Sequence, residues 1–275
     1  MNSLTKEKKQ HYFSFKRKYL CIPYGVFLVL FIIIPIFLII FYAFTDANGS
    51  FSFESLVGFF TTWTKINVLF VSAFVALQTT LICLLIGYPL AYFLADKKIN
   101  KNAVLVTLFI APMWINFVLR TGATRDLLTW FGINGGTNPY LATLIGMVYN
   151  YLPFVILPLY TTMIKLDKSQ IEAAADLGAN PAEVFFKNIV PQSFPGIVSA
   201  ILMTFMPTMS SYVISDVLSE GKITLFGNYI YLDFSTNAWN DGSFMALIML
   251  AIVGISMFLT RNTEKDTASR GGGLW

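Results

Sequence analysis

Long uncharged stretches of the chain alternate with short charged segments, and this pattern constrains the fold more than any other feature of the sequence. Crossing about 30 Å of hydrocarbon takes about 20 residues of helix. Six stretches can do this: residues 20–44, 66–95, 102–119, 127–164, 188–215 and 242–260. Only 12% of the 275 residues are charged, which is about half the share in a soluble domain. We therefore predict an all-α membrane protein with six transmembrane helices in one domain, residues 20–261.

Two of the six stretches are longer than their helices need to be. The fourth begins with a glycine-rich, turn-forming segment, so we expect its helix to start near Tyr140. The fifth begins with Pro191 and Pro195, so we expect its helix to start near Gly196. The first stretch holds 25 uncharged residues, more than the apolar core of a signal peptide, and is expected to remain as a span.

The basic residues are divided unequally between the two sides that six spans define. Fifteen of the 19 lie before the first span, in the segments 97–101 and 165–187, or after the last span. The other side holds only Lys65, Arg120, Arg125 and Lys222. Because cytoplasmic loops carry the excess of Lys and Arg, we predict that the basic tail 1–19, the loop 165–195 and the tail 262–275 are all cytoplasmic.

The sequence offers little for catalysis or metal binding. The two cysteines, Cys21 and Cys83, lie in apolar stretches, and the single histidine is His11 in the basic tail, so neither a metal site nor a disulfide framework is expected. The pair Gly221-Lys222 lacks the glycine that a phosphate-binding loop needs five positions earlier. We expect a chain that is not an enzyme and binds no cofactor.

The loop 165–195 is predicted to form a helical hairpin. Ser169 and Glu172 have the spacing of a capping box for a first helix, residues 170–177, and Gly178 follows as its terminator. Asn180 can cap a second helix with Pro181 in its first position. That helix should stop near residue 190, because a proline at position 191 disfavours the helical conformation in the residue before it.

The same loop resembles the EAA loop of binding-protein-dependent ABC importer permeases. The resemblance lies in Glu172-Ala173-Ala174, then Gly178 after three intervening residues, then a hydrophobic residue before Pro191. The family has isoleucine where this chain has Asn188. The resemblance implies the type I importer permease fold, and it implies that Glu172, Ala173, Ala174, Gly178 and Pro191 belong to the element that couples the permease to an ATPase.

Further segments resemble the spermidine/putrescine (PotB-like) permeases within this family. They are residues 85–95, Pro112 with Trp114, Asn116 and Arg120, residues 152–154, 158–160 and 165–168, residues 211–216, and Gly227-Asn228. The similarity runs from about residue 24 to residue 258. The outer loop 122–137 is shorter than in the family, which bears on contacts with a binding protein.

The resemblance also implies partners and a location. These are a dimer of ATPase subunits that holds ATP and Mg²⁺, a second homologous permease and an extracellular or periplasmic substrate-binding protein. The chain would be a multi-pass protein of the bacterial cytoplasmic membrane, surrounded by lipid, with no nucleic acid partner.

A polyamine is a flexible polycation, so its path should offer carboxylates and aromatic faces. Tyr212 and Asp216 are four residues apart and share one helix face. Trp114 and Asn116 could line the same path, and the positive Arg120 suits a gate or a structural role. Equally, Asp216 could be an ordinary residue at a helix end and Trp114 an interfacial aromatic.

Two other interpretations stay open at this point. The substrate could be iron, sulfate, molybdate or thiamine, which importers with the same loop carry. The chain could also be a secondary transporter or channel that needs no ATPase, which would be expected to show internal repeats.

Overall fold

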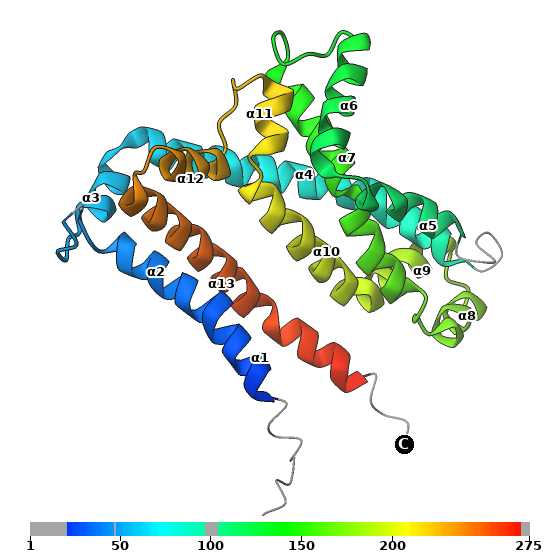
Figure 1. Cartoon of the computed structure of the whole chain (residues 1–275). Helices are drawn as coiled ribbons and strands as arrows, with labels where there is room; N and C mark the ends of the chain where they lie inside the picture. Colours follow the sequence, from blue (N-terminus) through cyan, green and yellow to red (C-terminus); the bar gives the residue numbers. More distant parts are fainter. Residues whose placement is uncertain (1–20, 47, 97–103, 271–275) are drawn as a thin grey trace, which may run out of the picture.

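A computed structural model describes residues 21–46, 48–96 and 104–270 (Figure 1). Over these residues the chain is mostly helical, and its only strand-like pairing is one antiparallel bridge between Thr45 and Phe51. The tail 1–19, the lysines of the segment 97–101 and the last five residues, for which a cytoplasmic location is predicted, lie outside the described residues.

Within the described residues, five helices are long and apolar enough to cross a membrane, and a bent pair of helices would make a sixth span. The first span joins α1 (Cys21–Leu28), a π-helical turn (Val29–Ile33) and α2 (Ile34–Ala43). The others among the five are α4 (Trp63–Ala95), α7 (Pro139–Met163), the helix Pro181–Ser210 and α13 (Trp239–Arg270). The prediction of an all-α membrane fold is confirmed.

The third predicted span is the bent pair. Its first half joins α5 (Val104–Ile110) to a 3-10 turn (Ala111–Trp114), and its second half is α6 (Phe117–Trp130). The two halves meet at 98°. The first part of the predicted outer loop 122–137 is helical, because α6 continues to Trp130.

The other boundaries differ from prediction mainly at the ends. The helix of the fourth span starts at Pro139, one residue before the expected Tyr140. The last helix, α13, continues to Arg270, ten residues past the predicted end of the span. The predicted tail 262–275 is thus helical through residue 270.

Three short helices at the end of the bundle away from the hairpin are absent from the sequence prediction. They are α3 (Glu54–Thr61), α11 (Val213–Ser219) and α12 (Phe226–Ser235). Figure 1 shows them at the upper side of the molecule, with α6. The start of α1, the end of α13 and the hairpin helices α8 (Lys168–Asp176) and α9 (Pro181–Val184) lie toward the opposite side. The side that faces the cytoplasm stays a prediction from the basic residues.

Close helix packing in the middle of the bundle depends on small residues, as is usual in membranes. Helices α4, α7 and α10 (Val190–Ser210) contact one another around Cys83, Val155 and Ala200, which are fully buried. A Cβ placed on Gly87 would come within 2.8 Å of the Val155 side chain. The glycine therefore permits the close approach of α4 to α7.

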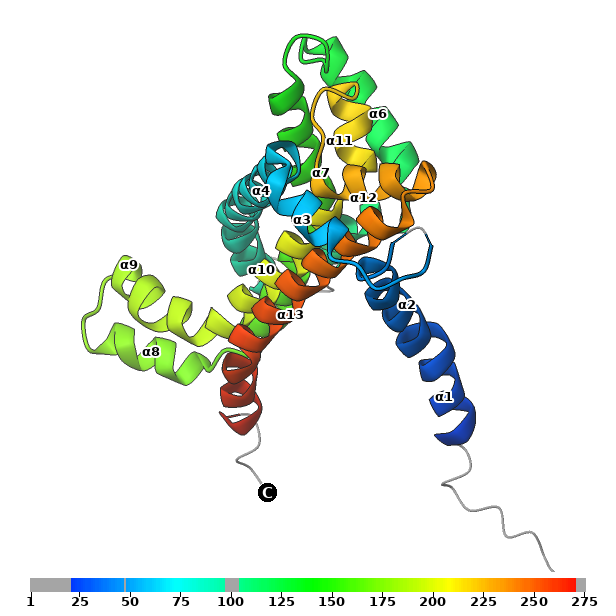
Figure 2. The same cartoon turned by 90° about the vertical axis from the view of Figure 1, so that its left-hand side faces the viewer.

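The first span stands apart from this centre. Helix α2 contacts α13, whereas α1 leans away from the bundle (Figure 2). Large apolar side chains such as Phe31 and Phe37 are about two-thirds exposed along it. Lipid or another apolar partner is needed to cover these side chains.

Candidate functional site

The hairpin forms as predicted, but its first helix is capped by a different residue. Asp167, not Ser169, is the N-cap of α8 and accepts a hydrogen bond from the Ser169 amide at 3.0 Å. The Ser169 hydroxyl donates to the same carboxylate oxygen at 2.6 Å. These bonds hold the pKa of the Asp167 carboxyl below its usual value. The predicted Ser169–Glu172 capping box is wrong, because a charged acceptor two residues earlier takes the cap.

The second cap agrees with prediction. Gly178 follows α8 with φ +83°, in the left-handed region that favours glycine. Asn180 then accepts from the Glu183 amide at 2.9 Å, and the Glu183 carboxylate accepts from the Asn180 amide at 3.2 Å. This reciprocal pair is a capping box around Pro181. The hairpin tip between the two helices is thereby fixed at both ends.

The predicted stop near residue 190 is wrong. The chain runs as one helix from Pro181 to Ser210 through Pro191, so the expected start of the span at Gly196 is also wrong. A π-helical turn, Phe185–Ile189, directly precedes the proline segment. Its wider ring relieves the clash that a proline makes with the preceding turn of an α-helix. The hairpin is continuous with the fifth span.

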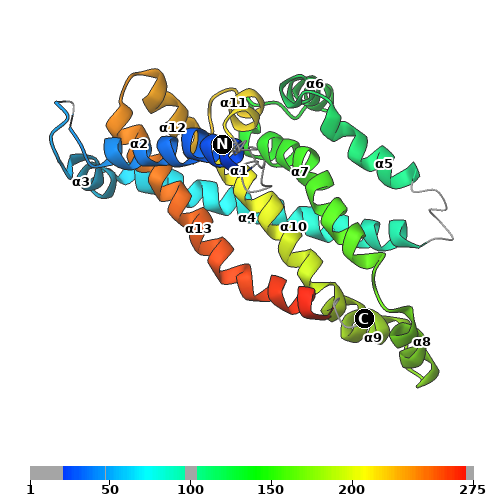
Figure 3. The ribbon, with the colours of Figure 1, turned by 60° about the horizontal axis from the view of Figure 1, so that its bottom comes forward.

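The predicted coupling residues lie mostly on the surface of the hairpin, which projects from the bundle between the end of α7 and the start of α10 (Figures 2 and 3). Glu172, Ala173 and Gly178 are exposed and Ala174 is half-buried, while Pro191 is exposed further along the second helix. Sequence reasoning missed Leu177, which is 89% exposed. It borders a hollow of about 400 Å³ between the two helices, lined also by Ala174, Gly178, Ala179, Glu183, Val184, Lys187 and Asn188.

Asn188, where the chain departs from the family pattern, connects the two hairpin helices. Its side-chain amide donates to the backbone carbonyl of Gln170 in α8 at 3.2 Å. Its side-chain oxygen accepts a hydrogen bond from Gln192, one turn further along the second helix. The isoleucine of the family could pack here but could make neither bond.

Trp114 and Asn116 lie at the bend in the third span. Trp114 ends the 3-10 turn and is 77% exposed. Asn116 is the N-cap of α6, and its side-chain oxygen accepts from the amides of Val118 at 2.9 Å and Leu119 at 3.4 Å. The sequence predicted polar groups within this span, but not that they would mark a change of direction.

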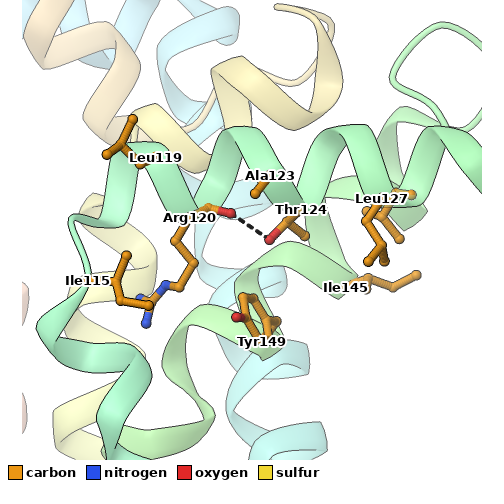
Figure 4. A pocket seen from close by; sticks show the side chains of 9 residues that line it. Ile115, Leu119, Arg120, Ala123, Thr124, Leu127, Ile145 and Tyr149 are labelled. Carbon is orange, nitrogen blue, oxygen red and sulfur yellow. Dashed lines mark hydrogen bonds between the residues drawn. The ribbon is translucent and has the colours of Figure 1, made fainter.

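Arg120 is almost buried and makes several contacts at the same bend. Its Nε donates to Asn150 Oδ1 at 2.8 Å, and a terminal nitrogen donates to the Pro112 carbonyl at 2.6 Å. Its guanidinium carbon lies 5.7 Å from the centre of the Tyr149 ring. The side chain borders an otherwise mostly apolar pocket of about 540 Å³ between α6 and α7 (Figure 4). Of its two predicted roles, this arrangement favours the structural one.

Tyr212 and Asp216 lie at a second helix break. Helix α10 ends at Ser210, and Tyr212 is the N-cap of α11. The predicted fifth span, residues 188–215, thus ends earlier than expected. The Asp216 amide donates to the Tyr212 carbonyl at 2.9 Å, which places the exposed carboxylate one turn further on.

The structure adds a second tyrosine to this break. The Tyr231 ring on α12 stacks on the Tyr212 ring, with centroids 4.8 Å apart and planes 9° from parallel. Both side chains are exposed, at 39% and 56% for Tyr212 and Tyr231. Asn228 holds α12 against α11, because its side chain accepts from the Ser215 hydroxyl at 2.8 Å and donates to the Tyr212 carbonyl at 3.4 Å.

These helices and breaks belong to a known architecture. Residues 87–265 match the family of binding-protein-dependent transport system inner membrane components. The chain belongs to this family. It is therefore a multi-pass transport permease of the inner membrane.

Two transport permeases are similar in sequence to this chain over most of its length. The spermidine/putrescine transport system permease protein PotB of Escherichia coli strain K12 is 32% identical, over 84% of this chain and 92% of the relative. The corresponding protein of Haemophilus influenzae is 31% identical, over 86% of this chain and 90% of the relative. A bacterial ABC transporter that imports the polysaccharide alginate superposes with a TM-score of 0.62 at 16% identity, covering 89% and 94% of the two chains. This likeness confirms the importer permease fold.

Sequence reasoning missed two residues of the permease that join the helix breaks through α7. Asn150 binds Arg120, and the Tyr151 hydroxyl donates to the Pro207 carbonyl in α10 at 3.1 Å. An amide in the middle of an apolar span was the available signal for Asn150, since polar side chains there commonly bond across helices.

Proposed function

We propose that this permease imports polyamines of the spermidine/putrescine class, driven by ATP hydrolysis on a partner ATPase subunit. The observation that carries the substrate class is the 32% identity to a spermidine/putrescine permease over 84% of the chain. In this proposal the chain binds no cofactor, while ATP and Mg²⁺ bind the ATPase. A second homologous permease and a substrate-binding protein outside the membrane complete the importer.

The hairpin is the proposed docking element for the ATPase. Its two caps and the Asn188–Gln170 bond fix the two helices relative to each other. The nearly fully exposed Leu177 gives it an apolar tip beside the small residues Ala173 and Gly178. A stiff element of this kind can transmit a rigid-body movement of a partner to the spans.

The break between α10 and α11 is the proposed contact with substrate. The stacked rings of Tyr212 and Tyr231 offer an aromatic face for methylene groups and for cation–π contact with ammonium groups. Asp216, one turn along α11, supplies a carboxylate for a charge-assisted hydrogen bond. Trp114 and Asn116 at the other break are proposed to line the same path.

The test is uptake by the complete complex in proteoliposomes. We expect co-purification with an ATPase and a second permease, and ATP hydrolysis stimulated by binding protein loaded with spermidine or putrescine but not with sulfate or thiamine. We expect Asp216→Asn to lower uptake about tenfold, because a hydrogen bond to a charged group is worth roughly 1.5–3 kcal/mol. Asp126→Asn is the matched control, since Asp126 is an exposed acid on α6 paired with its neighbour Arg125.

Each arm can reject one part of the proposal. Normal uptake by Asp216→Asn would remove Asp216 from the path. Stimulation by an anion instead of a polyamine would make the substrate class wrong. A permease that purifies alone and transports without ATP would make the ATPase partnership wrong.

A further inference from the structure

The hairpin meets the membrane helices at the π-helical turn Phe185–Ile189. The turn closes with a hydrogen bond from the Val190 amide to the Phe185 carbonyl. Pro191 follows directly and supplies no backbone donor of its own. The regular hydrogen-bond ladder is therefore interrupted at the point where the hairpin becomes the fifth span.

The part of α4 that packs against this turn also contains a proline. Pro89 lies inside the helix, and it leaves the carbonyl four residues before it without the usual backbone donor. Tyr88 and Tyr92 flank this proline and lie one turn apart on one face of α4. Two helices whose backbone hydrogen-bond pattern is interrupted by a proline thus pack against each other near those prolines.

Phe185 connects the two helices. Its ring lies edge-on to Tyr88, with centroids 5.6 Å apart and planes at 88°, and edge-on to Tyr92, at 5.8 Å and 85°. These are favourable aromatic geometries. The phenyl ring of the π-helical turn therefore sits between two rings of α4.

A hydrogen bond joins the same helices on the other side of the π-helical turn. The Tyr88 hydroxyl and the Ser193 hydroxyl are 2.6 Å apart, and Ser193 is fully buried. Because the Ser193 hydroxyl donates to the Val190 carbonyl at 3.1 Å, Tyr88 is left as the donor to Ser193. Helix α4 is held to the second hairpin helix both before and after Pro191.

A chain of contacts thus runs from α8 to α4. Asn188 in the π-helical turn bonds the α8 backbone at Gln170, and Phe185 in the same turn packs between the α4 tyrosines. We propose that Phe185 is a positioning residue that makes α4 follow the hairpin when the ATPase moves it. Without this ring, the interrupted ladder beside Pro191 lets the hairpin tilt while α4 stays in place. The inference rests on the proposed function of the hairpin as the ATPase dock.

The test compares two neighbouring phenylalanines in the assembled complex. Phe185→Leu keeps an apolar side chain and removes the ring, whereas Phe185→Tyr keeps the ring. Phe186→Leu is the matched control, because Phe186 is 68% exposed in the same turn. We expect Phe185→Leu to lower the number of substrate molecules imported per ATP by about fivefold, at the small end of measured coupling between sites. Phe185→Tyr and Phe186→Leu should keep the wild-type ratio.

A second measurement does not depend on the substrate. Spin labels at Ala175→Cys on α8 and Phe93→Cys on α4, in a Cys21→Ala background, report the distance between the two helices with and without ATP. We expect an unchanged distance in the wild type and an altered distance on adding ATP in Phe185→Leu. Complexes without polyamine-stimulated hydrolysis would reject the proposed substrate while leaving this measurement intact.

Two results would overturn the proposal. One is a wild-type import ratio and an unchanged label distance in Phe185→Leu. The other is a proportional loss of ATP hydrolysis and import with loss of the co-purified ATPase, since Phe185 would then support assembly and not transmission.

Discussion

Replacing Arg120 by leucine tests whether one buried cation holds the bend of the third span. Arg120 donates to the Pro112 carbonyl on one side of the bend and to Asn150 on α7. The leucine variant removes both bonds. The Pro112 carbonyl keeps a partner, because it also accepts from the Ile115 amide at 3.3 Å. The loss therefore falls mainly on the Asn150 side-chain oxygen.

The magnitude follows from what such bonds contribute in membranes. A hydrogen bond to a charged group is worth about 1.5–3 kcal/mol in soluble proteins. Interhelical hydrogen bonds inside membranes average about 0.6 kcal/mol and reach about 1.7 kcal/mol. For two bonds, one of which leaves a partner unpaired, we expect Arg120→Leu to cost about 2 kcal/mol. This corresponds to a fall in Tm of roughly 4–8 °C for a chain of this length.

The assay is thermal unfolding of the purified permease, followed by tryptophan fluorescence, together with uptake by the complex. Arg120→Lys should lose about half as much, since an ammonium group cannot reproduce the planar fork of arginine. The double variant Arg120→Leu/Asn150→Leu should cost less than the sum of the two single changes, because the unpaired amide oxygen is gone. An Arg120→Leu protein with the wild-type Tm but altered uptake would refute this reasoning and favour the gate role.

Two further changes test other parts of the fold. A Cβ on Gly227 would overlap the backbone oxygen of Ser210, whereas the atom closest to a Cβ on Gly146 is Cδ1, at the end of the Leu218 side chain. Because a side-chain end can shift more easily than backbone, we expect Gly227→Ala to lower the yield of folded protein on size exclusion much more than Gly146→Ala. Equal yields would contradict the close approach of α12 to α10. Burial raises the pKa of the Asp233 carboxyl, with Lys65 opposing and Asp241 adding to the shift, and its Oδ2 has no partner among the described residues. Because the pKa is higher in the folded state, the stability of the wild type falls as the pH rises from the unfolded-state pKa through the folded-state pKa. Asp233→Asn should therefore raise the Tm, relative to the wild type, more at pH 7.5 than at pH 5. A Tm below that of the wild type at pH 7.5 would contradict this prediction.

The sequence predicted those parts of the fold that local physics determines. Apolar length located the spans, and Gly178 and Asn180 located the ends of the hairpin helices, because each acts within a few residues. The continuity through Pro191 was not predictable from such rules. It depends on the π-helical turn and on contacts with Tyr88 of α4, about a hundred residues earlier in the chain.

Some residues of the candidate site could likewise be predicted from the sequence, and others could not. Tyr212 and Asp216 could be proposed from their spacing within one helix. Tyr231 could not, because its relation to Tyr212 exists only once α12 folds back on α11. Arg120 was noticed as a cation in an apolar stretch, but its role depends on the position of Asn150, which comes from packing of α6 on α7.

The two helix breaks explain why these particular residues are together candidates for a substrate path. Trp114 and Asn116 flank one break, and Tyr212 begins the helix after the other. Helix α7 joins them through neighbouring residues, since Asn150 binds Arg120 beyond the first break and Tyr151 binds the Pro207 carbonyl before the second. Irregular backbone at membrane depth is tolerated where it is buried in protein or lines a polar cavity. Both breaks are bonded to α7 through polar side chains. This arrangement favours a substrate path beside the two breaks over a path along the unbroken helices.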